Sequence, residues 1–282
     1  MRSRGLTPLF LVSTTVVGVL AAAPTADAKP APRKAGIEIR YDPPKNPEHQ
    51  GIYDTLRKAK ALERIRDRLA GISLPRTLLL KTEGCDGDIN AAYDPGESAI
   101  GICYEYLAYI QELAGKIPPD IAAKESLTPA NYVVGPFLEV TLHELAHAIF
   151  DLRKVPVLGR EEDAADQVAT YVLLQFGNDE VRRVISSIAV MYASEAREAA
   201  PKLKDFANEH GLPAQRFFNL ICITYGSDPK FFGDAVSRGY LPADRAEQCP
   251  GEFAQVKYAF DTLIWPVLGA RKPPPANLPR KP

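Results

Sequence analysis

Hydrophobic positions follow two different periods along the chain, and the change between them predicts its architecture. Short apolar runs predict strands at Thr77–Lys81, Ile89–Tyr93 and Ala99–Tyr104, with a further short strand at Ile37–Tyr41. Apolar residues at helical spacing predict a helical segment from Pro47 to Ala70. Further helices are predicted at Tyr104–Gly115, Pro136–Leu152, Glu161–Phe176, Asp179–Glu195, Pro213–Thr224 and Gly251–Trp265. A small sheet followed by helices indicates an α+β fold.

The first 28 residues have the features of a secretory signal peptide. A basic start precedes an apolar run from Leu9 to Ala23, and small residues before Ala28 form a cleavage site. The apolar run is too short to span a membrane ahead of a folded domain. We therefore expect an exported protein, periplasmic or secreted, with no membrane anchor after cleavage near Ala28.

The remaining chain divides into three parts by composition. Residues 29–47 are rich in proline and basic residues and predict an exposed lead-in. Residues 48–270 are expected to form the folded domain, with the sheet within about 48–152 and a helical part within about 153–270. Residues 271–282 are proline-rich, cannot form a helix and predict a disordered tail.

Charge and cysteine content narrow the class of protein. The chain has 34 basic and 35 acidic residues, and this near-balance gives no electrostatic basis for binding nucleic acid or an anionic membrane. Four cysteines in an exported chain predict disulfides, and none has the spacing of a metal-binding pair. Three pairings are open, with buried thiols as the alternative. We favour Cys85–Cys103 and Cys222–Cys249 because each closes a short loop.

The pattern His143-Glu144-Leu145-Ala146-His147 lies in a segment predicted to be a helix. Residues i and i+4 lie one turn apart on the same face, so His143 and His147 can share one metal ion. Glu144 is then directed at the same site as a candidate general base. The alternative is a stacked pair of histidines with a solvated acid. Two imidazoles in so apolar a helix would lack polar partners, which favours a zinc site.

A catalytic zinc needs a third protein ligand and an open position. The next predicted helix begins Glu161-Glu162-Asp163, where acids also suit the helix dipole without any metal. Glu162 and Asp166 form an i, i+4 carboxylate pair, at the spacing where one can bind metal and the other can orient a histidine. Asp151 is the alternative third ligand, but it lies one turn past His147 on the same helix.

These residues resemble the gluzincin pattern of zinc peptidases. The resemblance implies a zincin-like fold, one catalytic Zn²⁺, Glu162 as the third ligand, and Asp166 as acceptor from a ligating histidine. The metzincin pattern does not fit, because Phe150 and Arg153 stand where it has glycine and histidine. The wider sequence resembles a family of exported bacterial zinc metallopeptidases of unknown physiological role. Besides the metal motif, the stretches that carry this resemblance are Gly101–Leu107 and Gln215–Tyr225.

The resemblance implies peptide hydrolysis by a zinc-activated water, with Glu144 as general base. A donor for the developing oxyanion is expected in the later helical region, where Tyr225 and His210 rank ahead of Arg216. Asn90–Tyr93 resembles the edge strand with which thermolysin-like enzymes pair a peptide, although a plain hairpin strand is the alternative.

The expected partner is a peptide or protein substrate. Two other functions remain open. One is a zincin-fold binding or regulatory protein without hydrolysis. The other is a zinc amidase that acts on a cell-wall component. An intact Glu144 argues against the first of these, because a structural zinc site gains nothing from a base.

Overall fold

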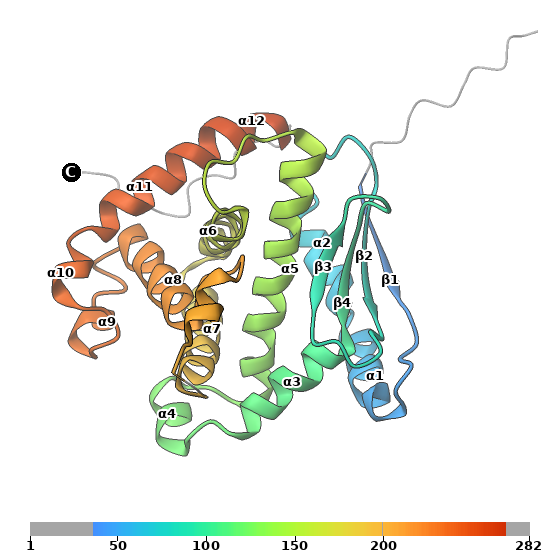
Figure 1. Cartoon of the computed structure of the whole chain (residues 1–282), viewed down its shortest axis with the longest axis horizontal. Coiled ribbons are helices and arrows are strands. Elements are labelled where there is room, and N and C mark those ends of the chain that lie inside the picture. The colour runs from blue at the N-terminus through green and yellow to red at the C-terminus, as the bar shows by residue number, and fades with distance from the viewer. Residues whose placement is uncertain (1–35, 199, 269–282) are drawn as a thin grey trace, which may run out of the picture. The chain divides into compact units, whose positions relative to one another are not determined.

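Four short strands form one mixed sheet that precedes the helices (Figure 1). The computed structural model describes residues 36–198 and 200–268, so the expected signal peptide and the proline-rich tail lie outside the described residues. The strands are β1 (Ile37–Tyr41), β2 (Leu78–Glu83), β3 (Ala91–Asp94) and β4 (Ala99–Cys103), in the order β1-β2-β4-β3. β1, β2 and β4 are parallel, and β3 runs antiparallel to β4 at the edge of the sheet. This arrangement confirms the predicted α+β class.

The helices fill the remainder of the chain. Between β1 and β2, a 3₁₀ turn (Pro47–His49) leads into α1 (Gln50–Ala59) and α2 (Ala61–Arg68). After it come α3 (Tyr104–Gly115), α4 (Pro119–Lys124), α5 (Pro129–Arg153), α6 (Glu161–Leu173), α7 (Asn178–Glu198), α8 (Pro213–Ser227), α9 (Asp234–Ser237), α10 (Ala243–Ala246), α11 (Cys249–Ala259) and α12 (Trp265–Leu268). 3₁₀ turns follow α6 (Leu174–Phe176) and α7 (Leu203–Ala207), and a π-helical turn (Phe260–Ile264) joins the last two helices.

Two comparisons with the sequence prediction concern the sheet and the central helix. The strand predicted at Ile37–Tyr41 forms β1 and pairs with β2 along its whole length, so the sheet begins inside the segment expected to be a lead-in. α5 begins at Pro129 rather than Pro136, because Thr128 and Asn131 form a capping box at its start. Pro136 lies inside the helix, where it removes one backbone donor without ending the helix.

α5 is the central helix of the fold. Figure 1 shows it standing between the sheet and the helices α6, α7 and α8. By length and composition α5 could cross a membrane, but 78% of its most apolar window is buried inside the protein, as in the core helix of a soluble domain. Its buried side chains on the two sides join the sheet and the helices in one hydrophobic core.

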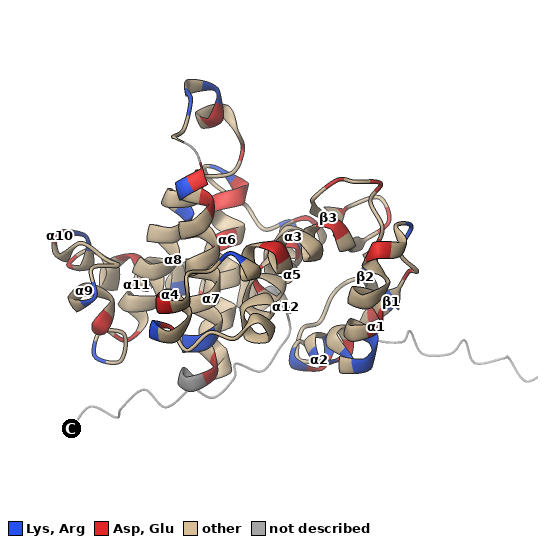
Figure 2. Cartoon of the chain, turned by 90° about the horizontal axis from the view of Figure 1, so that it is seen from below, with Lys and Arg blue, Asp and Glu red and all other residues tan. Residues whose placement is uncertain are grey.

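Two disulfides connect neighbouring elements, and they are the two pairings favoured from sequence. Cys85–Cys103 closes a loop that contains the hairpin of β3 and β4. Cys222–Cys249 joins α8 to the first turn of α11. Both are compatible with a protein that matures in an oxidising compartment. Basic and acidic residues are interspersed on the helices and loops, as the near-balanced charge leads one to expect (Figure 2).

α5 approaches α7 so closely at Gly135 that a larger side chain there should destabilise the fold. A Cβ atom added at Gly135 of α5 would overlap Ser187 Oγ and lie 2.7 Å from the carbonyl oxygen of Val184, both on α7. We expect Gly135→Ala to lower the free energy of unfolding by about 1–3 kcal/mol through overpacking. Urea denaturation measures this change.

Gly115, the last residue of α3, is the matched control. A Cβ atom there has nothing within 4 Å. Gly115→Ala should leave stability unchanged or raise it by up to about 1 kcal/mol through helix propensity. Equal effects of the two substitutions would contradict the close helix crossing.

Candidate metal centre

The sequence motif lies in the second half of α5 and faces the first turns of α6. His143 and Glu144 are buried, with 3% and 7% of their surfaces exposed. The apolar residues of the same helix, among them Leu142, Leu145 and Ile149, are directed into the core. The helix thus packs on one face and presents polar groups on another, as its 3.6-residue period allows.

Three donor groups converge at one point between these helices. The Nε2 atoms of His143 and His147 lie 3.1 Å apart. Glu162 Oε2 lies 2.9 Å from the first of these nitrogens and 3.3 Å from the second. Each of the three residues therefore offers one ligand atom to a common centre. The structure brings together the three residues that the sequence singled out as a ligand set.

The outer nitrogen of each imidazole is held by a carboxylate. His143 Nδ1 lies 2.8 Å from Asp166 Oδ1, the contact expected from the gluzincin resemblance. His147 Nδ1 lies 2.8 Å from Glu161 Oε1, a contact that the sequence did not lead us to expect. A carboxylate at the Nδ1 position fixes the ring orientation and leaves Nε2 free to act as a ligand.

A partly buried arginine from α8, with 19% of its side chain exposed, anchors this arrangement. Arg216 contacts both oxygens of Asp166, with its Nε 2.8 Å from Oδ2. It also lies 3.3 Å from Glu139 Oε1, which accepts a hydrogen bond of 2.7 Å from the hydroxyl of Tyr192. The guanidinium stacks over the Tyr192 ring. Four helices therefore meet through one network of buried charge.

The electrostatics of the network are set by this pairing. Burial alone would raise the pKa of Asp166, but Arg216 and the bond to His143 outweigh it and lower that pKa to about 2. For Glu139, burial dominates and raises the pKa despite Arg216. Burial opposes the charged form of His143, but its bonds to Asp166 and Glu162 raise its pKa to about 10. Without metal, the site therefore holds protons where a metal would bind.

Glu144 faces the edge of the sheet. Its Oε2 accepts a hydrogen bond of 2.8 Å from the backbone N–H of Tyr93 in β3. Burial raises the pKa of the Glu144 carboxyl, partly offset by the two histidines. A carboxylate with a raised pKa is a better proton acceptor at neutral pH than an ordinary glutamate.

A cleft of about 560 Å³ opens between β3 and the helices. Asn90–Tyr93 line one side, and the motif residues, Glu161, Glu162 and Arg216 line the other. His210, from the segment ahead of α8, also lines the cleft. Its Nε2 lies 2.8 Å from Glu162 Oε2, and its ring stacks on His143 at 5.7 Å between centroids.

Tyr225 does not belong to this site. It lines a second cavity, on the side of α7 and α8 that faces α4 and α9, and it is not among the residues that line the cleft. The expectation that Tyr225 donates to an oxyanion is therefore corrected. Of the two ranked candidates, the structure places only His210 beside the ligand set.

Several residues of the site were missed or assigned differently from sequence. Glu161 was missed because an acidic residue in the first turn of a helix also interacts favourably with the helix dipole, with or without a metal site. Glu139 lies four residues before His143, and this spacing on one helix face could have revealed it. Arg216 was considered as an oxyanion donor, but it is paired with Asp166 and Glu139. Asp151, the alternative third ligand, instead accepts a hydrogen bond from the Tyr93 hydroxyl at the rim of the cleft.

Comparison with known proteins adds one finding. Residues 41–264 of the chain match the model of a protein family described as "Putative metallopeptidase". No curated protein and no solved structure matches the chain.

The raised pKa of His143 predicts how the stability of the metal-free protein depends on pH. A group whose pKa rises from 6.5 in the unfolded chain to about 10 in the folded protein stabilises most below pH 6.5. We therefore expect the unfolding free energy of chelator-treated protein to fall as the pH rises from about 6.5 towards 10.

Chemical denaturation at several pH values measures this dependence. The fall should be smaller in His143→Gln, which cannot carry the charge. The same slope in both proteins would contradict the role assigned to His143.

Proposed function

The chain belongs to this metallopeptidase family, and we propose that it is a zinc-dependent peptidase whose metal ligands are His143, His147 and Glu162. The observation that carries the proposal is the convergence of two imidazole Nε2 atoms and one carboxylate oxygen, each imidazole being held from behind by a carboxylate. A carboxylate behind each imidazole is the support that histidine ligands of metal ions typically have.

The donor set fits zinc in both chemistry and spacing. Zinc takes nitrogen and oxygen ligands at about 2.0–2.1 Å, so ligands of a tetrahedral site lie about 3.3 Å from one another. The three donor atoms here lie 2.9, 3.1 and 3.3 Å apart. Three protein ligands are the number typical of catalytic zinc sites, which keep one position open. When bound, zinc would polarise a substrate carbonyl and acidify a water molecule.

Glu144 is assigned the role of general base and then general acid. Its carboxylate would take the proton of the attacking water and pass it to the leaving amine. The hydrogen bond from Tyr93 N–H holds one of its oxygens in place. Its raised pKa suits a group that must accept and release a proton near neutrality.

The edge strand supports a peptide as the substrate. Asn90 accepts a hydrogen bond from Cys103 N–H in β4, so the alternate residues Ala91 and Tyr93 direct their backbone groups towards the cleft. The contact of Tyr93 N–H with Glu144 agrees with this direction. An extended peptide could pair with this edge and bring an amide bond to the base.

His210 is assigned as the donor to the developing oxyanion. It lies in the segment ahead of α8, whereas the proposed ligands lie on α5 and α6. Its side chain contacts Glu162 and is partly exposed in the cleft. The same position supports a second candidate function. If His210 is a fourth metal ligand, the site is closed, and the protein binds zinc without hydrolysis.

Export of the protein is part of the proposal. Two disulfides and a start with the features of a signal peptide support maturation outside the cytoplasm. The substrate is then a peptide or protein of that compartment.

Glu144→Gln tests the catalytic assignment. The substitution keeps the shape of the side chain and the metal ligands but removes the base. We expect the variant to retain zinc, measured by metal analysis, and to lose peptide hydrolysis by roughly 10²–10⁴-fold. Glu112→Gln, an exposed position that pairs with Lys116, is the matched control and should keep both properties. A zinc-loaded Glu144→Gln variant with full activity would contradict the assignment of Glu144 as the general base.

His210→Ala separates the two candidate functions. If His210 is the oxyanion donor, the variant keeps its zinc affinity and loses about 10²–10³-fold in kcat. If His210 is a fourth ligand, zinc affinity falls and the wild-type protein hydrolyses no peptide. Zinc titration alongside an assay on a generic peptide mixture measures both quantities.

A further inference from the structure

One carboxylate of the cleft is not used by the proposed chemistry. Glu195 lies on α7, one turn after Tyr192, and both side chains line the cleft that contains the metal ligands. Glu195 is partly buried, and its Oε1 accepts a hydrogen bond of 3.2 Å from the hydroxyl of Tyr109 in α3. In the part of the chain that the structure describes, no lysine, arginine or histidine forms an ion pair with it.

The other carboxylates that line the cleft have a partner, a proposed role or contact with water. Four of them contact an arginine, lysine or histidine side chain of the protein: Glu139 with Arg216, Asp151 with Lys154, Glu161 with His147, and Glu162 with the two motif histidines. Glu144 is the proposed base, and Glu209 is exposed and therefore hydrated. Glu195 is the remaining carboxylate of the cleft, and no cation of the described residues pairs with it.

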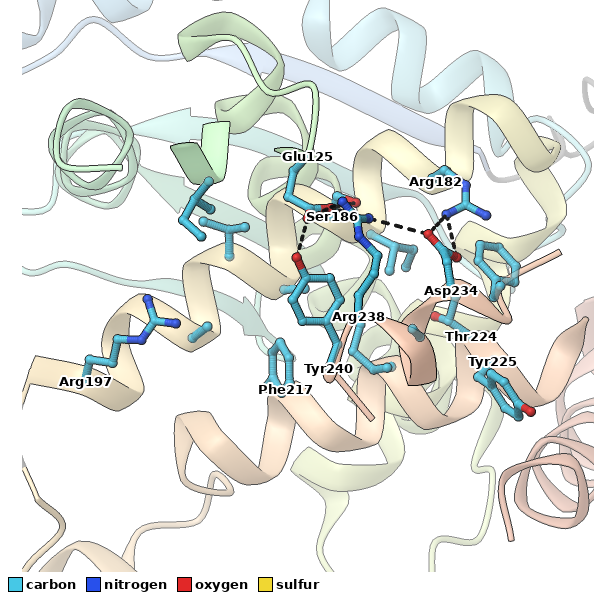
Figure 3. Close-up of a pocket in the computed structure, with 18 residues that line it drawn as sticks. Glu125, Arg182, Ser186, Arg197, Phe217, Thr224, Tyr225, Asp234, Arg238 and Tyr240 are labelled. Carbon is cyan, nitrogen blue, oxygen red and sulfur yellow. Dashed lines mark hydrogen bonds and ion pairs between the residues drawn. The ribbon is translucent and has the colours of Figure 1, made fainter. Parts of the chain in front are cut away.

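Carboxylates elsewhere in the helical part are also paired with cations. Tyr225 lines a second cavity, and Figure 3 shows the carboxylates of that cavity, Glu125 and Asp234, next to arginine side chains. Arg238 lies 3.0 Å from Glu125, and Arg182 lies 3.0 Å from Asp234. The chain itself thus supplies the counter-charges there. In the cleft of the metal centre, it supplies none to Glu195.

A carboxylate in this position is poorly compensated. Partial burial removes part of its hydration, and one hydrogen bond from a neutral hydroxyl does not replace what is lost. Burial accordingly raises the pKa of the Glu195 carboxyl, and the negative charges of Glu139 and Glu198 add to the rise. The bond from Tyr109 and the more distant Arg216 offset it only in part. A cation placed against this carboxylate would stabilise its charged form.

The surroundings of Glu195 suit a cation on a long stem. Met191 lies one turn earlier on the same face of α7 and also lines the cleft, so it provides apolar surface for an aliphatic chain. Across the cleft lies the β3 edge, with which a peptide would pair. A peptide held there would be the nearest source of the missing positive charge.

We infer that Glu195 is a specificity-determining residue, which receives a positively charged group of the peptide substrate. The group is a lysine or arginine side chain, or the free terminal ammonium group of the peptide. This inference rests on the proposed peptidase function, because it assigns a charge preference to the same cleft. Peptides with a cation at one fixed distance from the cleaved bond are then the preferred substrates.

Matched peptides test this preference. They share one sequence, have both termini blocked, and carry either lysine or glutamine at a single varied position. We expect kcat/KM of the zinc-loaded protein to be about 10–100-fold higher for lysine at one position, as a hydrogen bond between charged groups implies. Glu195→Gln should remove this preference, and Glu195→Lys should reverse it in favour of a peptide with glutamate at that position. The same peptides with a free N-terminus measure the contribution of the ammonium group.

Glu198→Gln is the matched control. Glu198 is the last residue of α7, is exposed and does not line the cleft, so its substitution removes the same charge from the same helix without changing the wall of the cleft. This variant should keep the lysine preference of the wild type. Its loss in Glu198→Gln would mean that the preference depends on the general charge of the protein, which would overturn the inference.

A binding measurement separates this inference from the proposed function. Fluorescence anisotropy of labelled peptides with the zinc-loaded Glu144→Gln protein reports affinity without hydrolysis. Tighter binding of a cationic peptide that is lost when Glu195→Gln is added supports the inference, even if the wild type hydrolyses no peptide. Hydrolysis with no charge preference, or with the same preference in Glu195→Gln, would overturn the inference and leave the peptidase assignment intact. The absence of both hydrolysis and charge-dependent binding would overturn both.

Discussion

One largely buried cation, the Arg216 guanidinium, holds together the candidate metal centre. It compensates the buried Glu139 and the partly buried Asp166, and so joins α8 to α5 and α6. Removal of one partner from such a buried cluster typically costs about 3–5 kcal/mol, because the remaining charge is left uncompensated. Asp166 also holds Nδ1 of His143. The interaction that assembles three helices therefore also orients the side chain of a candidate metal ligand.

The support of the two histidines is unequal. His143 is buried, and the carboxylate behind it is neutralised by Arg216, so its orientation is fixed by the core of the protein. The side chain of His147 is held by Glu161, which is 54% exposed at the start of α6. Surface ion pairs contribute little rigidity compared with buried ones. Of the two candidate histidine ligands, one thus depends on packing, and the other depends on a contact open to solvent.

Sequence periodicity was sufficient for the features that depend on a single helix. The i, i+4 spacing predicted both the histidine pair and the carboxylate pair of Glu162 and Asp166, because neighbours one turn apart share a face in any α-helix. It could not predict which face of α8 meets the site. Arg216 and Tyr225 are nine residues apart, or two and a half turns, so they lie on opposite faces of the helix. Arg216 lines the cleft, and Tyr225 consequently lines the other cavity.

The Cys85–Cys103 disulfide has a consequence for the wall of the cleft. It closes the loop that contains the β3 hairpin, and Glu105 fastens the same end by accepting hydrogen bonds from the N–H groups of Cys85 and Gly87. Closing a loop of this size lowers the conformational entropy of the unfolded chain, which contributes about 3 kcal/mol to the stability of the folded protein. While the two cysteines are still thiols, the strand that faces Glu144 lacks this covalent tie. The oxidation of one cysteine pair therefore makes this wall of the cleft firmer, so the redox state of the surroundings takes part in assembling the cleft.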